Sequence, residues 1–231
     1  MSAKNTALIL VAGGSGTRMG GDLPKQYIEL NGCEIIEHTM RAFCNSHVVG
    51  KIIIVCAKDY TLHIQTLAQK LETDIPFVIT EGGTTRQDSV QNGLKLASDC
   101  EFVMIHDAVR CCITPYEISK LADTLWQGKS CALGVRVKDT IKRAASDNQI
   151  IETVNRDGLW HIQTPQAFVT SEVVSAHEIA RKSGFVATDD CAVAENAGMS
   201  VTIVEGNDTN IKVTTPVDLL IASEILKGRS Q

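Results

Sequence analysis

Two cations and a run of glycines follow the first apolar segment of the chain. The stretch LVAGGSGTRMGGDLPKQ contains Gly13, Gly14 and Gly16, and it continues to Arg18 and Lys25. Glycines permit tight turns in which backbone amides point at an anion, and the two cations add charge-assisted contacts to phosphate oxygens. The stretch therefore predicts a polyphosphate site in which Arg18 and Lys25 stabilise charge that develops during phosphoryl-type transfer. A flexible loop with solvated charges is the alternative, which the position directly after a buried strand disfavours.

The spacing of this loop fits neither of the two common phosphate-binding motifs. From Gly14 the order G-S-G-T-R-M-G is one residue too long for the dinucleotide fingerprint. That fingerprint also needs an acid at the end of the second strand, where this chain has Lys58. A P-loop needs lysine directly after its last glycine, whereas Lys25 lies between Pro24 and Gln26. A dehydrogenase and a P-loop site are therefore both disfavoured.

A carboxylate, Asp107, directly follows another apolar segment in the stretch MIHDAVR. Asp107 is well placed to bind Mg²⁺, which takes carboxylate and phosphate oxygens. Helix capping is the alternative role for Asp107, but a triphosphate in a cleft needs charge neutralisation. Arg110 is then expected to face the phosphates or the acceptor. His106 has no partner at metal-ligating spacing, so we expect a packed, hydrogen-bonded imidazole.

Apolar segments alternate with helical patterns along the chain, which predicts crossover units on a mostly parallel sheet. Such a sheet binds ligands beyond the carboxyl ends of its strands. We expect one α/β, Rossmann-like domain over residues 1–231. The expected strands are Ala7–Ala12, Lys51–Ala57, Phe77–Thr80, Phe102–His106, Cys131–Val137 and Ser200–Val204. The expected helices are Glu34–Cys44, Tyr60–Glu72, Arg86–Ala97, Pro115–Gln127, Ser171–Ser183 and Pro216–Lys227.

One stretch interrupts this alternation. The segments KDTIKR and QIIETV flank the polar tip AASDN, a pattern typical of a β-hairpin. An isolated hairpin is marginal in water, so its apolar side is expected to pack on another surface. We interpret residues 137–157 as an inserted β-arm for dimerisation. A hairpin folded back on its own domain is the alternative.

Composition restricts the class of protein further. The formal net charge of -5 and a pI near 5.7 disfavour a nonspecific nucleic-acid or membrane-surface binder. The 8 cysteines form no C-x-x-C pair, so a structural zinc site is not expected. We expect the cysteines to be buried or semi-buried free thiols instead. The first apolar run is too short for a signal peptide, and no stretch approaches the roughly 20 residues of a membrane span. These features predict a soluble, cytoplasmic protein.

Five segments, taken together, resemble one enzyme family. The first loop is similar to the pattern L-x-A-G-G-x-G-T-R-M, then P-K, of nucleotidyltransferases that activate sugar or polyol phosphates, and PKQ resembles their cytidylyltransferase branch. With HDAVR, LWHIQTPQAF, TDD and NIKVTTPVDL, the chain resembles the 2-C-methyl-D-erythritol 4-phosphate cytidylyltransferases of the non-mevalonate isoprenoid pathway. The resemblance runs from the first strand to the last helix. One departure is Cys111-Cys112 after HDAVR, where the family often has proline, which affects the expected local turn.

The resemblance implies a nucleotidyltransferase domain that uses Mg²⁺ to move CMP from CTP to a polyol phosphate, with pyrophosphate as the second product. It also implies a homodimer in which Thr140 and Arg156 of the arm complete the partner's site. Lys212 matches the family lysine that positions the acceptor phosphate. Asp208 is a weaker candidate for assisting Mg²⁺, since its register against the family is not fixed.

The expected site residues fall into three groups. The catalytic set is Arg18, Lys25, Arg156 and Lys212. The CTP-binding set, in which Asp107 also binds the metal, is Ala12, Gly13, Gly14, Gly16, Gly83, Ser89, Asp107 and Ala108. The acceptor-binding set is Arg110, Thr140, Thr164, Thr188 and Asp189.

Some of these roles have plainer alternatives. Gly83 lies at a strand-to-helix junction that presents backbone amides, with Arg86 expected to support the loop. Ordinary capping of a helix would explain Ser89, and it would also explain one acid of the pair Asp189 and Asp190. Trp160 and Phe168 are expected to pack rather than to recognise substrate.

Two other functions remain as alternatives. A ribitol 5-phosphate cytidylyltransferase shares the glycine loop, PKQ and QTPQ, and Gly13 favours it, whereas LWHIQTPQ and TDDCAVAENAG favour methylerythritol phosphate. A non-catalytic nucleotide-binding regulator is expected to have lost Arg18, Lys25 or Asp107, and all three are present.

Overall fold

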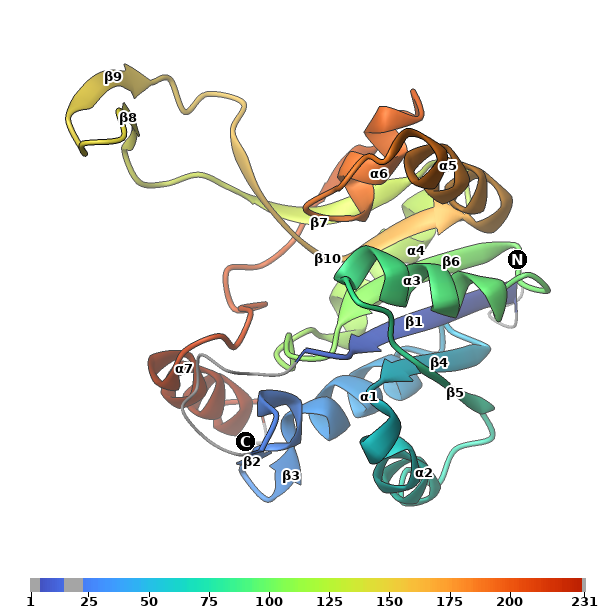
Figure 1. The fold of residues 1–231 in the computed structure, drawn as a ribbon. Helices are drawn as coiled ribbons and strands as arrows, with labels where there is room; N and C mark the ends of the chain where they lie inside the picture. Colours follow the sequence, from blue (N-terminus) through green and yellow to red (C-terminus); the bar gives the residue numbers. More distant parts are fainter. Residues whose placement is uncertain (1–4, 15–22, 230–231) are drawn as a thin grey trace.

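A computed structural model describes residues 5–14 and 23–229 of the chain. Gly16 and Arg18, both expected to bind phosphate, lie outside the described residues. A seven-stranded sheet forms the centre of the molecule, with strand order β11-β7-β10-β6-β1-β4-β5 (Figure 1). Its strands are β1 (Thr6–Ala12), β4 (Lys51–Cys56), β5 (Phe77–Glu81), β6 (Phe102–Asp107), β7 (Cys131–Arg136), β10 (Trp160–Val169) and β11 (Thr202–Glu205).

Most neighbouring strands are parallel, which confirms the predicted fold class. β1 pairs in parallel with β4 and β6, β4 with β5, and β11 with β7. β10 is the exception, because it runs antiparallel to both β6 and β7. Sequence analysis did not predict β10: Pro165 interrupts its apolar pattern, and the register shifts between Ile162 and Gln166. This strand brings the QTPQ motif to the end of β6.

Helices cover both faces of the sheet. Successive side chains of a strand point to opposite faces, so Leu8 and Leu10 join one buried cluster while Ala7 and Ile9 join the other. Helices α1, α2 and α4 pack on the first face, and α3, α5 and α6 pack on the second (Figure 1). Their bounds are α1 (Ile35–Ser46), α2 (Thr61–Gln69), α3 (Arg86–Lys95), α4 (Pro115–Leu125), α5 (Thr170–Ser183) and α6 (Asp190–Asn196).

Capping boxes set where several helices begin. Thr85 accepts from the amide of Asp88 at the start of α3, and the Asp88 side chain accepts from the Thr85 amide. Thr114 and Glu117 do the same for α4, ahead of Pro115. Each box satisfies two donors that a helix start otherwise leaves open. The starts of α3 and α4 therefore coincide with the predicted ones.

The last helix, α7 (Pro216–Lys227), packs away from the main sheet. It covers a third cluster that includes Val109, Cys111 and Cys112, beside the small sheet of β2 (Glu29–Leu30) and β3 (Cys33–Glu34). The unusual cysteine pair thus lies buried under α7. Beyond the helix, Arg229 donates to the Cys112 carbonyl at 2.7 Å and to the Thr209 hydroxyl at 3.0 Å.

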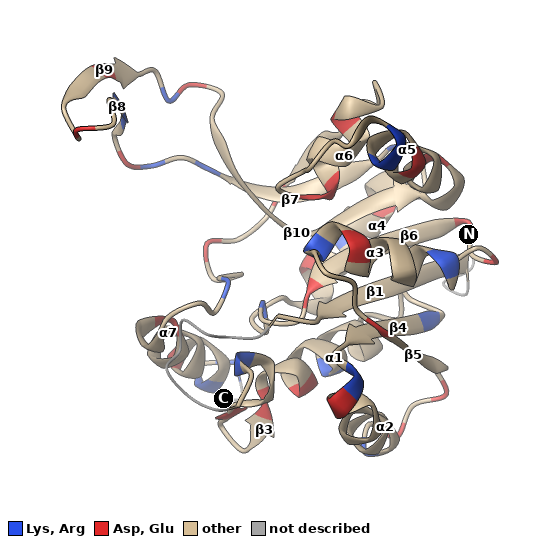
Figure 2. Ribbon diagram, in the orientation of Figure 1, with Lys and Arg blue, Asp and Glu red and all other residues tan. Residues whose placement is uncertain are grey.

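A two-stranded hairpin of β8 (Ile141–Ala144) and β9 (Ile150–Val154) forms a separate sheet that projects from the body at the upper left of Figure 1. None of residues 138–159 is buried. Figure 2 shows both signs of charge along this arm. In the folded chain by itself, the arm has little support from the domain that carries it.

Two further expectations concern the whole chain. All 8 cysteines are free thiols and six of them are buried, as predicted. In the described parts of the chain, no helix has the length and apolar character that crossing a membrane requires.

Candidate active site

A cavity of about 550 Å³ lies where the carboxyl ends of β1, β5 and β6 meet. This is the edge of a parallel sheet at which ligands are expected. Two short connections, the glycine loop after β1 and the junction before α3, form much of its wall. Eight predicted site residues line it: Ala12, Gly13, Gly14, Lys25, Gly83, Ser89, Asp107 and Lys212.

A single turn of 3₁₀ helix, η3 (Lys25–Tyr27), holds Lys25 at this cavity. Tyr27 is buried and stacks on Tyr60 from the segment before α2, with ring centroids 4.2 Å apart. The neighbouring Gln26 carboxamide donates to the carbonyl of Ala12 at 2.6 Å and of Gly14 at 3.2 Å. Sequence analysis used Gln26 only as a mark of the cytidylyltransferase branch and missed these contacts.

The junction between β5 and α3 is held by Ser89. Its hydroxyl accepts from the Gly83 amide at 3.0 Å and donates to the Thr85 carbonyl at 2.9 Å. A Cβ atom on Gly83 would lie 2.2 Å from the Asp88 Cβ, so no side chain fits there without a shift of the helix start. Ser89 thus shapes the cavity wall through the backbone, and its contact with a nucleotide stays a prediction.

Asp107 is the negative centre of the site. Its Oδ1 is 3.1 Å from Arg86 Nε and its Oδ2 is 2.7 Å from Lys212 Nζ, with Arg110 Nε at 4.0 Å from Oδ2. Burial raises the pKa of the Asp107 carboxyl, but Arg86 and Lys212 outweigh burial and hold that pKa well below its usual range. The alternative of helix capping is wrong, because Thr114 is the N-cap of α4.

Arg86 connects this carboxylate to a second, deeper one. Its Nη1 is 2.9 Å from Oδ2 of Asp190, whose side chain is only 1% exposed. Asp190 opens α6, and its amide donates to the Gln166 side chain at 2.9 Å. One guanidinium therefore bridges two buried carboxylates, and its charge is shared between them. Sequence analysis gave Asp190 only a capping role and did not predict this contact.

Asp189, predicted to touch the acceptor, caps α6 instead. Its Oδ1 accepts from the Ala192 amide at 2.9 Å and its Oδ2 accepts from Gln166 at 2.8 Å. Both oxygens are engaged within the fold, so the capping alternative describes this residue. Thr188 is exposed, and neither residue is among the described residues that line the cavity.

Thr164 also acts from behind the site. Its buried hydroxyl accepts from the Asp107 amide at 3.1 Å and lies 3.0 Å from Nδ1 of His106. His106 is packed as predicted, against Phe43 and with Nε2 3.3 Å from the Arg110 carbonyl. Burial lowers the pKa of His106 to about 3, so the imidazole is neutral. The Thr164 hydroxyl therefore supports Asp107 from a buried position, and its contact with the acceptor stays a prediction.

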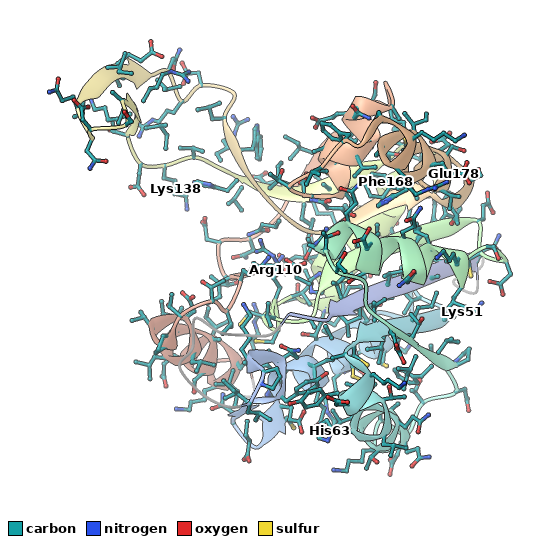
Figure 3. The ribbon with its side chains drawn as sticks, in the orientation of Figure 1. Lys51, His63, Arg110, Lys138, Phe168 and Glu178 are labelled. Carbon is teal, nitrogen blue, oxygen red and sulfur yellow. The ribbon has the colours of Figure 1, made fainter. Side chains whose placement is uncertain are left out.

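Two more predicted residues support the wall instead of lining it. Ala108 is fully buried. Its amide donates to the Val11 carbonyl at 3.1 Å, and its carbonyl accepts from the Thr39 hydroxyl at 2.9 Å. Arg110, labelled near the centre of Figure 3, donates to the Asn210 carbonyl at 2.8 Å. The buried Asn210 in turn donates to the Thr164 carbonyl at 2.9 Å. This chain of bonds places the segment that carries Lys212 against the end of β6.

The two predicted residues of the arm are not brought to the cavity. Thr140 and Arg156 are exposed, and neither is among the described residues that line the pocket. Arg156 donates to the Lys138 carbonyl at the base of the arm. Lys138, labelled in Figure 3, pairs with Asp208, the weaker candidate for a metal ligand.

The charged groups of the cavity fit Mg²⁺ bound together with a nucleotide. Across residues 5–14 and 23–229, no three His, Cys, Asp or Glu side chains converge as a ready metal site. Among the described residues that line the cavity, Asp107 is the one carboxylate, and Mg²⁺ commonly takes one or two carboxylates together with phosphate oxygens and water. Lys212 holds Oδ2 of Asp107 in the free protein, so a metal there would compete with its ammonium.

Comparison with known sequences identifies the family. The profile of the IspD family, 2-C-methyl-D-erythritol 4-phosphate cytidylyltransferase, matches residues 6–228. The chain belongs to this family. The family enzyme of Caldanaerobacter subterraneus subsp. tengcongensis is 40% identical over 225 residues, which cover 96% of this chain and 99% of that one. The chloroplastic enzyme of Oryza sativa subsp. japonica is 37% identical, covering 98% of this chain and 76% of that one.

Solved structures agree with the family assignment. The crystal structure of 4-diphosphocytidyl-2C-methyl-D-erythritol synthase from Anaerococcus prevotii superimposes with a TM-score of 0.85 at 30% identity. The match covers 98% of this chain and all of that one, so the fold is shared over nearly the whole chain. The departure at Cys111-Cys112 leaves Asp107 in place at the end of β6.

Proposed function

We propose that the protein transfers CMP from CTP to 2-C-methyl-D-erythritol 4-phosphate, releasing pyrophosphate, in isoprenoid precursor biosynthesis. The observation that carries this proposal is the cavity that combines a glycine loop, Lys25, Lys212 and Asp107 at the carboxyl edge of the sheet. Family membership supports the same reaction, since the relatives carry that name.

The reaction needs little covalent help from the protein. An oxygen of the acceptor phosphate forms a bond to the α-phosphorus of CTP, and the bond from that phosphorus to the bridging oxygen breaks, with pyrophosphate leaving. The acceptor is already an anionic nucleophile, so no enzyme-bound intermediate and no proton abstraction are required. Catalysis then consists of positioning two anions and offsetting their repulsion. Mg²⁺, which Asp107 would hold, supplies neutralisation of the phosphate charge.

The cations of the site divide this work by position. Lys25 lies beside the glycine loop and faces the nucleotide phosphates, where it stabilises the negative charge of the transition state. Lys212 is 41% exposed and paired to Asp107, so its ammonium is able to turn to the acceptor phosphate once another cation satisfies the carboxylate. Arg86 is committed to Asp107 and Asp190, which leaves it a supporting role.

The arm supports a homodimer with shared sites as part of the same proposal. Ile150 is 65% exposed and Ile151 is 62% exposed, and exposed apolar side chains on a hairpin call for a covering surface. A second copy of the chain would cover them and would receive Thr140 and Arg156 near its acceptor site. The free thiols fit a reducing compartment such as the cytoplasm.

The test is pyrophosphate release by the purified protein with Mg²⁺ and CTP. We expect release with methylerythritol 4-phosphate and much less with ribitol 5-phosphate, the acceptor of the alternative enzyme. Release with ribitol phosphate alone would overturn the acceptor assignment and keep the cytidylyl transfer. Binding of CTP without release from either acceptor would favour a nucleotide-binding regulator. Replacing CTP by ATP is the control for the base, and the small glycine-lined wall is expected to reject a purine.

A further inference from the structure

Gln26 is a buried polar side chain at the edge of the cavity. It is 3% exposed, and its carboxamide nitrogen donates to two carbonyls of the glycine loop, those of Ala12 and Gly14. Both amide hydrogens are therefore committed to the loop. The two carbonyls flank Gly13, whose position in the cavity wall makes its orientation matter to any bound phosphate.

These two bonds fix which way the loop amides point. The carbonyl and the N–H of a trans peptide point in opposite directions. A carbonyl of Ala12 held towards Gln26 therefore turns the Gly13 amide away from Gln26. The described residues leave space on the side-chain side of the loop: a Cβ on Gly14 would meet none of them within 4 Å, and one on Gly13 would meet only the Ser89 Oγ at 3.7 Å.

The turn that carries the Gln26 side chain is itself held by several contacts. Gln26 lies in η3 between Lys25 and Tyr27, and the Tyr27 amide donates to the Pro24 carbonyl at 2.9 Å. The Tyr27 ring is clamped by the stack on Tyr60 and by the edge contact with His63, whose ring centroid is 5.3 Å away. The same turn thus fixes the glycine loop and the backbone of Lys25.

We propose that Gln26 is a positioning residue for phosphate transfer. It aligns the amides of the glycine loop and couples them to Lys25, so that the two phosphate-binding groups keep one relative geometry. This role deepens the proposed cytidylyl transfer and rests on it. Gln26 acts through the loop, and its own amide hydrogens do not contact the nucleotide.

Two substitutions of nearly the same volume separate positioning from packing. Gln26→Glu places a carboxylate against two carbonyl oxygens, and the side chain regains a donor only when it is protonated. Burial beside those oxygens raises the pKa of such a carboxyl towards the assay range. Gln26→Leu has no donor at any pH, and it leaves the carbonyls of Ala12 and Gly14 without this partner. Its thermal unfolding temperature is therefore measured beside that of the wild type, and kcat is compared at a temperature where both are folded.

The measurement is kcat for pyrophosphate release from pH 6 to pH 9, divided by that of the wild-type protein. We expect kcat of Gln26→Glu to be lower by about 100-fold at pH 9 and by about 10-fold at pH 6, since an ångström-scale misplacement costs on that order. Gln26→Leu is expected to lose about 100-fold at every pH. The KM for the acceptor should stay within about twofold, because the loop faces the nucleotide.

Shared titrations cancel in this comparison. Among the described residues, the charged groups that line the cavity are Lys25, Arg86, Asp107 and Lys212, and they are the same in both variants. The matched control is Gln127→Glu, because Gln127 is exposed and also donates to a backbone carbonyl, that of Asp123 at 3.0 Å, at the end of α4. We expect that control to match the wild type at every pH.

The proposal is overturned if both variants keep more than half of the wild-type kcat, if the ratio for Gln26→Glu does not change with pH, or if the loss appears only in the KM for the acceptor. Should the wild-type protein release no pyrophosphate, the proposed function fails separately. The same variants are then compared by their Kd for CTP. A weaker affinity that recovers at low pH only in Gln26→Glu supports the positioning role of Gln26, and affinities equal to that of the wild type overturn it.

Discussion

The cavity and the arm both carry residues expected to act on substrate, yet these residues are held in place in different ways. Cavity residues are tied by buried bonds between segments far apart in the chain, such as Thr164 to the amide of Asp107. The arm makes contacts mainly with its own base, and none of residues 138–159 is buried. The chain alone therefore determines the geometry of the described part of the cavity, whereas the proposed working position of the arm would depend on a second copy of the chain.

Lys25→Ala tests the cavity most severely. We expect kcat to fall by about 10³-fold, the loss found when a group that stabilises transition-state charge is removed. The thermal unfolding temperature should change little, because the variant keeps the stack of Tyr27 on Tyr60 that anchors η3. A loss confined to the KM for CTP would assign Lys25 to ground-state binding instead.

Asp107→Asn tests the buried ion pairs through stability. Because the pKa of Asp107 is lowered in the folded protein, its stabilising effect is present above the unfolded pKa of about 4 and is lost as pH falls below it. At pH 7 we expect the variant to lose about 3 kcal/mol of unfolding free energy, the lower end of the cost of breaking a buried pair.

Urea unfolding of both proteins at pH 7 and pH 3 measures this difference, which should shrink at pH 3. The control is Asp99→Asn, which removes an exposed partner of Lys51 and should matter far less. A difference that is equal at both pH values would mean that the charge of Asp107 does not stabilise the fold.

Mixing two inactive variants tests whether the arm crosses to a partner. Lys25→Ala removes a cation from the cavity and Arg156→Ala removes one from the arm. Each variant is expected to lose activity by roughly 100-fold or more. In a mixed dimer, one of the two sites combines an intact cavity with an intact arm. Because random exchange of equal amounts makes about half of the dimers mixed, about one quarter of the wild-type activity per site should return. No recovery after subunit exchange would indicate that each arm serves its own chain, as the alternative interpretation of the hairpin holds.

Ile151→Ser should have the smallest effect on the fold itself. Ile151 is exposed in the single chain, so we expect a change below about 0.5 kcal/mol in the stability of the dilute protein. The oligomeric state, measured by sedimentation over a range of concentrations, should shift towards the monomer. A large loss of stability without a change in association would place the arm against its own domain.

The same contrast separates what the sequence predicts from what it does not. Local signals located most strands and helices within a few residues, because apolar periodicity and capping residues such as Thr85 and Thr114 are read from neighbours in the chain. Glycines and charged residues at strand ends located the cavity for the same reason. β10 was not predicted because Pro165 interrupts its apolar pattern. In the folded protein, pairing with β6 and β7 forms the strand despite this proline.

The missed site residues depend on partners far along the chain. Gln26, Gln166 and Asn210 act through carboxamides that bond groups 12 to 46 residues away, and no spacing rule reveals such bonds. For Thr164 the motif was correctly placed, but the bond of its hydroxyl to the Asp107 amide was not predicted. Motifs thus identify the neighbourhood, and the three-dimensional contacts decide which side chain faces the ligand.

The contacts of Arg229 have a practical consequence for protein engineering. This side chain, just beyond α7, grips the Cys112 carbonyl and the Thr209 hydroxyl. Thr209 belongs to the short segment that delivers Lys212 to Asp107. A purification tag or fusion partner attached just after residue 229 would therefore begin beside a contact that lies three residues from Lys212. A long linker at this end would let both hydrogen bonds of Arg229 form during kinetic work.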